Sequence, residues 1–141
     1  MIPRSVQFDL GRDKSRIKDP RDAERQHRTV DVILSRFFNR RSNERFEIQI
    51  LADEVGMGKT FVALAVAYSV LADMRSGTTE EDLQGCYQRV LVLTPQNSAL
   101  FRKWTREVAE FVRRCVLPDH GKEAEQWFSP VAVERLDELV S

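Results

Sequence analysis

The chain has 141 residues, of which 42% are hydrophobic and 31% charged, and its 22 Lys and Arg residues balance 22 Asp and Glu residues. This length allows one ordinary core and excludes two domains of usual size, while the composition excludes a disordered or low-complexity protein. The longest apolar run, residues 61–67, is far shorter than the roughly 20 residues of a membrane span, so no membrane partner is expected. Two distant cysteines without metal or redox spacing favour a reducing compartment, cytoplasmic or nuclear, of which we expect the cytoplasm.

The N-terminal third of the chain is basic. Residues 1–45 carry 12 Lys/Arg and 7 Asp/Glu, which gives +5, and residues 46–141 carry 10 and 15, which gives −5. Because acidic residues are interleaved and no aromatic platform accompanies the cations, a solvated helix surface is favoured over a nucleic-acid patch. Residues 1–21 show no sustained period, so the sequence predicts an extended, loosely attached arm that carries little of the fold.

The spacing of apolar residues predicts four helices. Between residues 22 and 41 apolar side chains recur at helical spacing among arginines, as in an amphipathic helix. Residues 59–73 are apolar on nearly every side, so this helix should be buried. Residues 98–114 predict a third helix with one apolar face. Residues 129–140, which begin with Ser-Pro, predict a fourth, although residues 131–133 could instead begin a strand.

Two apolar segments predict buried strands. Residues 46–52 (FEIQILA) alternate and then run apolar, and residues 89–95 (RVLVLTP) are β-branched and stopped by proline. A strand, a helix and a strand in one sheet form a right-handed βαβ unit. Residues 22–141 are therefore expected to form an α/β domain in which a parallel sheet lies between helical layers.

A glycine-rich stretch, residues 52–60, lies where the first predicted strand turns into a helix. Gly56 and Gly58 would let backbone N–H groups approach a β-phosphate, which the helix dipole also favours. Lys59 would bridge the β- and γ-phosphates, and the Thr60 hydroxyl would be a magnesium ligand. A chance glycine turn is the alternative, but the flanking strand and helix favour a Walker A phosphate loop.

The acidic pair before the glycines, Asp53 and Glu54, could also be read as a catalytic carboxylate pair. A magnesium-holding Asp and a water-activating Glu must approach from another strand, whereas these two residues belong to the loop that wraps the phosphates. They are therefore expected to accept loop N–H groups or to pair with a cation. The strict phosphate-loop pattern places glycine at position 53, so Asp53 argues against adenylate kinases and small GTPases.

Read as a unit, residues 50–60 (ILADEVGMGKT) resemble the Swi/Snf-like branch of superfamily-two helicases and DNA translocases. The resemblance implies a partial, incomplete RecA-like P-loop lobe that binds ATP and Mg²⁺. Within the stretch ERQHR, Gln26 resembles the glutamine that reads adenine; its alternative is a solvated helix residue. The implied nucleotide-binding residues are Gln26, Asp53, Glu54, Val55, Gly56, Met57, Gly58, Lys59 and Thr60.

A second stretch, residues 89–104, resembles the next motif of that family, an apolar strand followed by a helix that carries a tryptophan. The resemblance places Thr94 and Pro95 beside a bound nucleic-acid backbone, expected to be DNA. Trp104 matches the tryptophan, although core packing is the commoner role for such a residue.

The catalytic motifs of the family are absent from the sequence. No Asp-Glu-x-His pair follows the second predicted strand, and Asp137-Glu138 lacks an apolar strand before it. No catalytic residue is therefore expected, and the chain is interpreted as the N-terminal part of a first ATPase lobe, either a fragment or a truncated frame, whose partner is the rest of the helicase polypeptide. The alternatives are a non-catalytic nucleotide-binding or interaction module and another phosphate-loop enzyme, such as a small kinase. Unpaired sheet edges also predict marginal stability and self-association.

Overall fold

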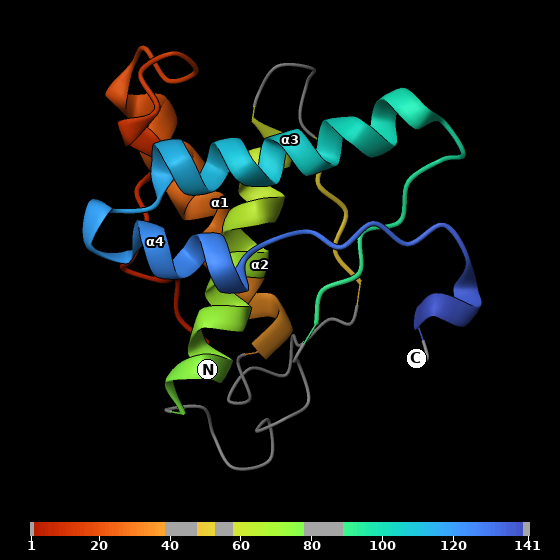
Figure 1. The fold of residues 1–141 in the computed structure, drawn as a ribbon. Helices are drawn as coiled ribbons and strands as arrows, with labels where there is room; N and C mark the ends of the chain where they lie inside the picture. The colour runs from red at the N-terminus through yellow and green to blue at the C-terminus, as the bar shows by residue number, and fades with distance from the viewer. Residues whose placement is uncertain (1, 39–47, 53–57, 78–88, 140–141) are drawn as a thin grey trace.

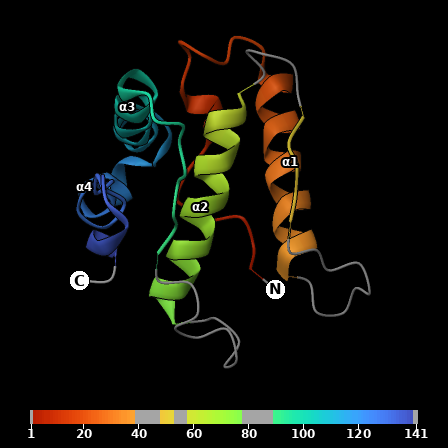
Figure 2. The same cartoon turned by 90° about the vertical axis from the view of Figure 1, so that its right-hand side faces the viewer.

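The computed structural model describes residues 2–38, 48–52, 58–77 and 89–139. In Figure 2 the helix α2 lies between α1 on one side and α3 with α4 on the other. The helices are α1 (Pro20–Phe38), α2 (Lys59–Ser76), α3 (Ser98–Cys115) and α4 (Pro118–Trp127), with short 3-10 helices η1 (Leu10–Arg12) and η3 (Leu136–Leu139) (Figure 1).

The predicted parallel sheet is wrong for the part of the chain that the structure describes. Residues 48–52 and 89–95 have no regular secondary structure, and residues 46–47 lie outside the described ranges. A strand persists only where a neighbouring strand takes up its backbone N–H and C=O groups. In Figure 2 residues 48–52 lie beside α1 and residues 89–95 on the other side of α2, so the two segments do not pair. The α/β, RecA-like architecture with a βαβ unit is therefore replaced by helices packed on one another.

Three of the four predicted helices are confirmed, as α1, α2 and α3. Asn97 caps α3, because its side-chain oxygen accepts from the N–H groups of Ala99 at 2.9 Å and Leu100 at 3.4 Å. The helix predicted at residues 129–140 is wrong for the described residues 129–139, of which only those of η3 are helical. The helix α4, which the sequence pattern did not predict, begins instead at Pro118, whose fixed φ suits the first helical position.

The N-terminal arm is not loosely attached. Ile2, Leu10 and Ile17 are buried, and Phe8 forms an isolated antiparallel bridge with Val116. The backbone N–H of Asp9 donates to the Cys115 carbonyl at 2.9 Å, and the N–H of Leu117 donates to the Gln7 carbonyl at 2.8 Å. Residues 2–17 therefore contact both the end of α3 and the N-terminal half of α1.

The core is an aromatic cluster around Tyr68 of α2. Its ring lies 5.7 Å from Phe8, 5.8 Å from Phe111 and 5.1 Å from Phe128, measured between centroids. The Tyr68 hydroxyl donates to the side-chain oxygen of Gln7 at 2.7 Å, and burial raises the pKa of Tyr68 to about 12. Because each partner comes from a different segment, this cluster fixes the arm, α2, α3 and the end of α4 together.

Candidate functional site

The start of α2 is the centre of the predicted phosphate loop. Gly58 immediately precedes the helix with a φ of 82°, a left-handed conformation that glycine adopts without strain. Its carbonyl accepts the first helical hydrogen bond, from the N–H of Val62 at 3.0 Å. The N-terminal end of α2 carries the positive end of the helix dipole and the first-turn N–H groups, so it is the end of this helix at which an anion would be stabilised.

Gln26 of α1 packs against this glycine. A Cβ atom placed on Gly58 would lie 2.3 Å from the Gln26 side-chain nitrogen, closer than any real contact. Gln26 is only 5% exposed, so the alternative of a solvated helix glutamine is wrong. The structure thus brings together two residues, Gln26 and Gly58, that the sequence assigned to one nucleotide site.

The remaining residues of the predicted loop are only partly described. Lys59 and Thr60 form the first turn of α2 and are both partly exposed. The other predicted members lie outside the described residues; they are Asp53, Glu54, Val55, Gly56 and Met57. The structure therefore describes four of the nine predicted nucleotide-binding residues, which are Gln26 and residues 58–60. Residues 58–60 lie at the start of α2, and Gln26 contacts Gly58 there.

The predicted nucleic-acid residues Thr94 and Pro95 lie in the irregular segment before α3. Pro95 is exposed and Thr94 partly so, and the Pro95 carbonyl accepts from the N–H of Asn97 at 2.7 Å. Trp104 is partly buried against the core. The core-packing role considered for that tryptophan therefore accounts for its position.

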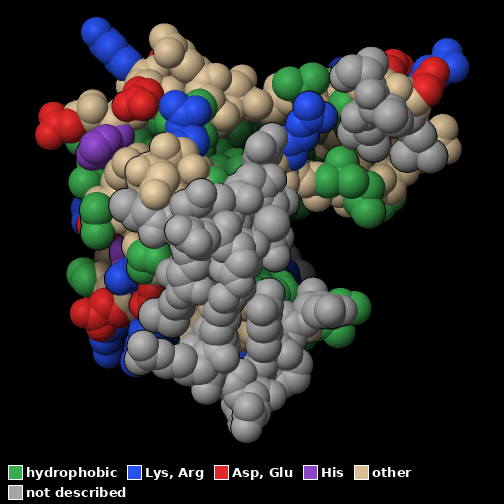
Figure 3. Space-filling view, turned by 90° about the horizontal axis from the view of Figure 1, so that it is seen from below, with side chains coloured by type: hydrophobic (Ala, Val, Ile, Leu, Met, Phe, Trp, Pro, Cys, Tyr) green, Lys and Arg blue, Asp and Glu red, His purple; other side chains and the backbone are tan. Residues whose placement is uncertain are grey.

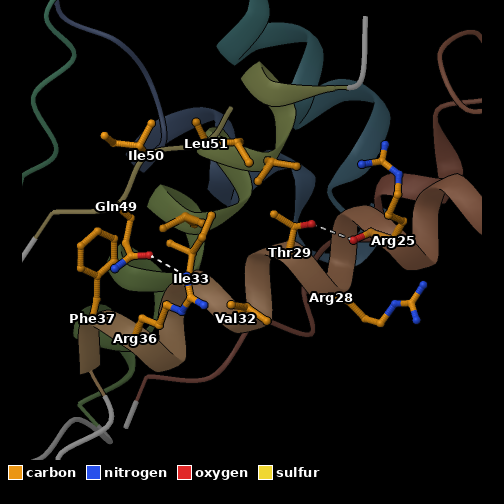
Figure 4. A pocket seen from close by; sticks show the side chains of 13 residues that line it. Arg25, Arg28, Thr29, Val32, Ile33, Arg36, Phe37, Gln49, Ile50 and Leu51 are labelled. Carbon is orange, nitrogen blue, oxygen red and sulfur yellow. Dashed lines mark hydrogen bonds between the residues drawn. The ribbon is translucent and has the colours of Figure 1, made fainter. Parts of the chain in front are cut away.

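A groove of about 530 Å³ runs along α1, α2 and residues 49–51 (Figure 4). Its lining includes Val62 and Val66, which follow Lys59 on the same face of α2. Gln49 accepts at its rim from Arg36 at 3.4 Å. None of Gln26, Gly58, Lys59 and Thr60 lines it, so this mostly apolar groove is distinct from the candidate phosphate site.

His27 of α1, the residue after Gln26, accepts a hydrogen bond from the N-terminal arm, residues 2–17. The backbone N–H of Leu10 donates to His27 Nε2 at 3.0 Å, so this nitrogen must be unprotonated. Burial, followed by the Arg4 charge, lowers the pKa of His27, although Asp9 and Asp31 oppose the shift. No motif marked His27 as a residue that bonds the arm to α1.

We predict that His27 makes stability depend on pH. Because the pKa of His27 is lowered in the folded state, the unfolded chain takes up the proton at a higher pH than the folded chain does. The contribution of His27 to the free energy of unfolding is therefore complete above the ordinary pKa of 6.5 and is lost as pH falls below it. The loss should be about 1 kcal/mol, the contribution of one hydrogen bond. Urea unfolding at pH 8 and pH 5.5 measures it in the wild type and in His27→Gln, which offers an acceptor that does not titrate. Identical pH dependence in both proteins would contradict the role of His27.

No group of three His, Cys, Asp or Glu side chains that could hold a metal occurs among the described residues. This does not conflict with the magnesium expected at Thr60, because nucleotide-bound Mg²⁺ takes most of its ligands from phosphates and water. Across the described ranges, no helix has the length and apolarity that crossing a membrane requires. Comparisons with family models, with characterised proteins and with solved structures found no match. The resemblance to Swi/Snf-like ATPases therefore rests on the motif residues alone.

Proposed function

We propose that this chain binds ATP–Mg²⁺ at the start of α2. The observation that carries the proposal is the buried contact of Gln26 with Gly58, because these residues come from different helices and were assigned to one site from sequence alone. An anion site at a helix N-terminus requires a loop and a helix, and both Lys59 and Thr60 lie in the first turn of α2.

Each residue has a distinct part in this proposal. Backbone N–H groups at the start of α2 hold phosphate oxygens, and Lys59 adds a mobile positive charge to them. The Thr60 hydroxyl supplies a ligand to Mg²⁺, and the Gln26 amide donates to and accepts from the adenine edge. The undescribed residues 53–57 complete the loop.

The motif resemblance extends the proposal to the class of protein. We infer that the chain is the N-terminal part of a Swi/Snf-like helicase or translocase ATPase of the cytoplasm, which in full length couples ATP hydrolysis to movement on nucleic acid. Thr94 and Pro95, in the exposed segment before α3, remain its proposed contacts with DNA. The helicase polypeptide beyond these motifs is its proposed partner.

Hydrolysis by the isolated chain should be negligible. A water-orienting carboxylate and a transition-state arginine each contribute orders of magnitude to the rate, and the sequence after residue 95 contains neither the Asp-Glu-x-His motif nor an arginine-finger motif of the family. We expect no ATP turnover above background in a steady-state assay with and without DNA. Turnover that DNA stimulates and that Lys59→Ala abolishes would show that a catalytic carboxylate is present.

The magnesium contact tests the proposal through Thr60. Thr60→Val keeps the shape of the side chain and removes the hydroxyl, so the affinity for ATP–Mg²⁺ should fall about 10-fold, roughly the loss of one charge-assisted bond. Thr60→Ser keeps the hydroxyl and should bind like the wild type. Fluorescence titration with ATP, in Mg²⁺ and in EDTA, provides the measurement. Equal binding by the valine variant in Mg²⁺ would contradict the proposed ligand.

A second candidate, a non-catalytic nucleotide-binding or interaction module, is favoured by the helical architecture. The described residues provide no sheet from which a catalytic carboxylate could approach the ion. Such a module would also bind ATP–Mg²⁺ and would show no turnover in the presence of the helicase polypeptide. Stimulated turnover in that mixture separates the two candidates.

A further inference from the structure

The end of the N-terminal arm contacts the first turn of α2 through a cation–π pair. The guanidinium carbon of Arg16 lies 3.9 Å from the centroid of the Phe61 ring, within the range of such a contact. Phe61 directly follows Thr60 in the sequence and is only 4% exposed. In Figure 2 the arm's 3-10 helix η1 lies at the end of the molecule where α2 begins. The arm therefore reaches the turn that carries Lys59 and Thr60.

Two carboxylates hold the guanidinium group of Arg16 over this ring. Its Nε lies 3.3 Å from Oδ2 of Asp13, and its Nη2 donates to Oε2 of Glu107 in α3 at 2.5 Å. Basic and acidic side chains are also interspersed on the described surface seen from below (Figure 3), but exposed pairs of that kind contribute little to stability. Here the Asp13 side chain is fully buried and that of Glu107 is 15% exposed, so solvent screens these pairs less. The planar face of Arg16 therefore stays against Phe61.

The Phe61 ring is held from a second direction by α3. It meets Phe111 edge-on, with the ring centroids 5.8 Å apart and the ring planes at 84°. Helix ends fray, and most of the stability of a helix in a protein comes from its tertiary packing. Because Lys59 and Thr60 share the first turn of α2 with Phe61, packing of this ring restricts where both side chains lie.

We propose that Arg16 is a positioning residue for the nucleotide site at the start of α2. Its contact with Phe61 holds the first turn in the conformation that binds ATP–Mg²⁺, so the affinity for ATP depends on a docked arm. This inference rests on the proposed function and adds to it a residue from outside the motif stretches. Coupling between two sites is reciprocal, so bound ATP–Mg²⁺ strengthens the docking of the arm by the same factor.

The matched variants Arg16→Ala and Arg114→Ala test the proposal. Arg114 also pairs with Asp13, at 3.6 Å from Nη1 to Oδ1, and each substitution removes one positive charge, but the contact with Phe61 belongs to Arg16. We expect both variants to unfold at lower urea concentration, whereas in calorimetric titration only Arg16→Ala should bind ATP–Mg²⁺ about 10-fold more weakly. Equal affinities of the two variants would overturn this inference alone. A wild type that binds no ATP–Mg²⁺ would overturn the proposed function together with it.

Arg16→Met separates position from charge. Methionine has a long, flexible side chain that can cover the Phe61 ring through a sulfur–aromatic contact, and it carries no charge. Arg16→Met should therefore recover most of the affinity that Arg16→Ala loses, with circular dichroism confirming that the helices are retained. An affinity as low as that of Arg16→Ala would mean that Arg16 acts through its charge, which would contradict the positioning role.

Hydrogen exchange of the wild type adds a measurement that needs no variant. The backbone N–H groups of Arg16 and Ile17 donate to the Asp13 carbonyl at 3.2 Å and 2.9 Å, so their exchange reports opening at the end of the arm. Saturating ATP–Mg²⁺ should slow this exchange by up to about 10-fold, the factor expected for the loss of affinity in Arg16→Ala. Unchanged exchange in a wild type that binds ATP–Mg²⁺ would contradict the coupling of the arm to the site.

Discussion

Lys59→Ala should weaken ATP–Mg²⁺ binding by about 100-fold, which is about 3 kcal/mol of lost charge-assisted hydrogen bonding to phosphate. Alanine is a better helix former than lysine, and Lys59 is only partly buried at the first position of α2, so the helix should be retained. The loss would then belong to binding and not to folding.

The matched control for this variant is Lys103→Ala, which removes an exposed lysine from α3. Its net charge change is the same, so any general electrostatic attraction of ATP falls equally in both variants. Calorimetric titration with ATP–Mg²⁺ compares them directly. If Lys103→Ala weakened binding as much as Lys59→Ala, the interaction would be a non-specific attraction and no phosphate site would lie at α2.

Gly58→Ala should damage both folding and binding. The residue has a φ of 82°, which costs a non-glycine residue about 1 to 3 kcal/mol. Its new Cβ would also overlap the Gln26 amide, so that buried side chain must move. The variant should unfold at lower urea concentration than the wild type and should bind ATP–Mg²⁺ weakly, because the displaced amide no longer meets adenine.

Gly77→Ala separates the two effects. Gly77 ends α2 with a φ of 69°, but a Cβ there meets nothing within 4 Å. The strain is therefore shared by both variants, and only Gly58→Ala adds the overlap, which should cost about 1 kcal/mol more. Gly77→Ala should keep normal ATP binding. Equal stability and equal binding in the two variants would mean that the contact of Gly58 with Gln26 has no consequence.

The helices were predictable because their signal is local. Val30 and Leu34 lie one turn apart on α1 and both are buried, as the spacing predicted. A strand cannot be predicted from its own residues alone, since it forms only when a second strand pairs with its backbone. The apolar residues 90–93 met every sequence criterion for a buried strand, and they lie exposed because no partner strand is supplied by the described chain.

The arm was misjudged for a different reason. Ile2, Phe8 and Leu10 are buried, but the apolar Val6 between them is 87% exposed, so the arm has no sustained period that could separate its buried residues from its exposed ones. The burial of Phe8 depends on Tyr68 of α2 and on Phe111 and Val116 at the end of α3, which are distant in sequence. The placement of Gln26 was predictable only through the motif resemblance, whereas His27 beside it carried no signal.

The most direct test is calorimetric titration of the wild type and of Gln26→Ala with ATP–Mg²⁺ and with GTP–Mg²⁺. A site in which Gln26 reads adenine should bind ATP saturably and GTP at least about 10-fold more weakly, since a buried amide paired with the wrong base edge loses its hydrogen bonds. Gln26→Ala should lose that preference. A folded wild type that binds neither nucleotide, or that binds both equally, would contradict the nucleotide site at the start of α2.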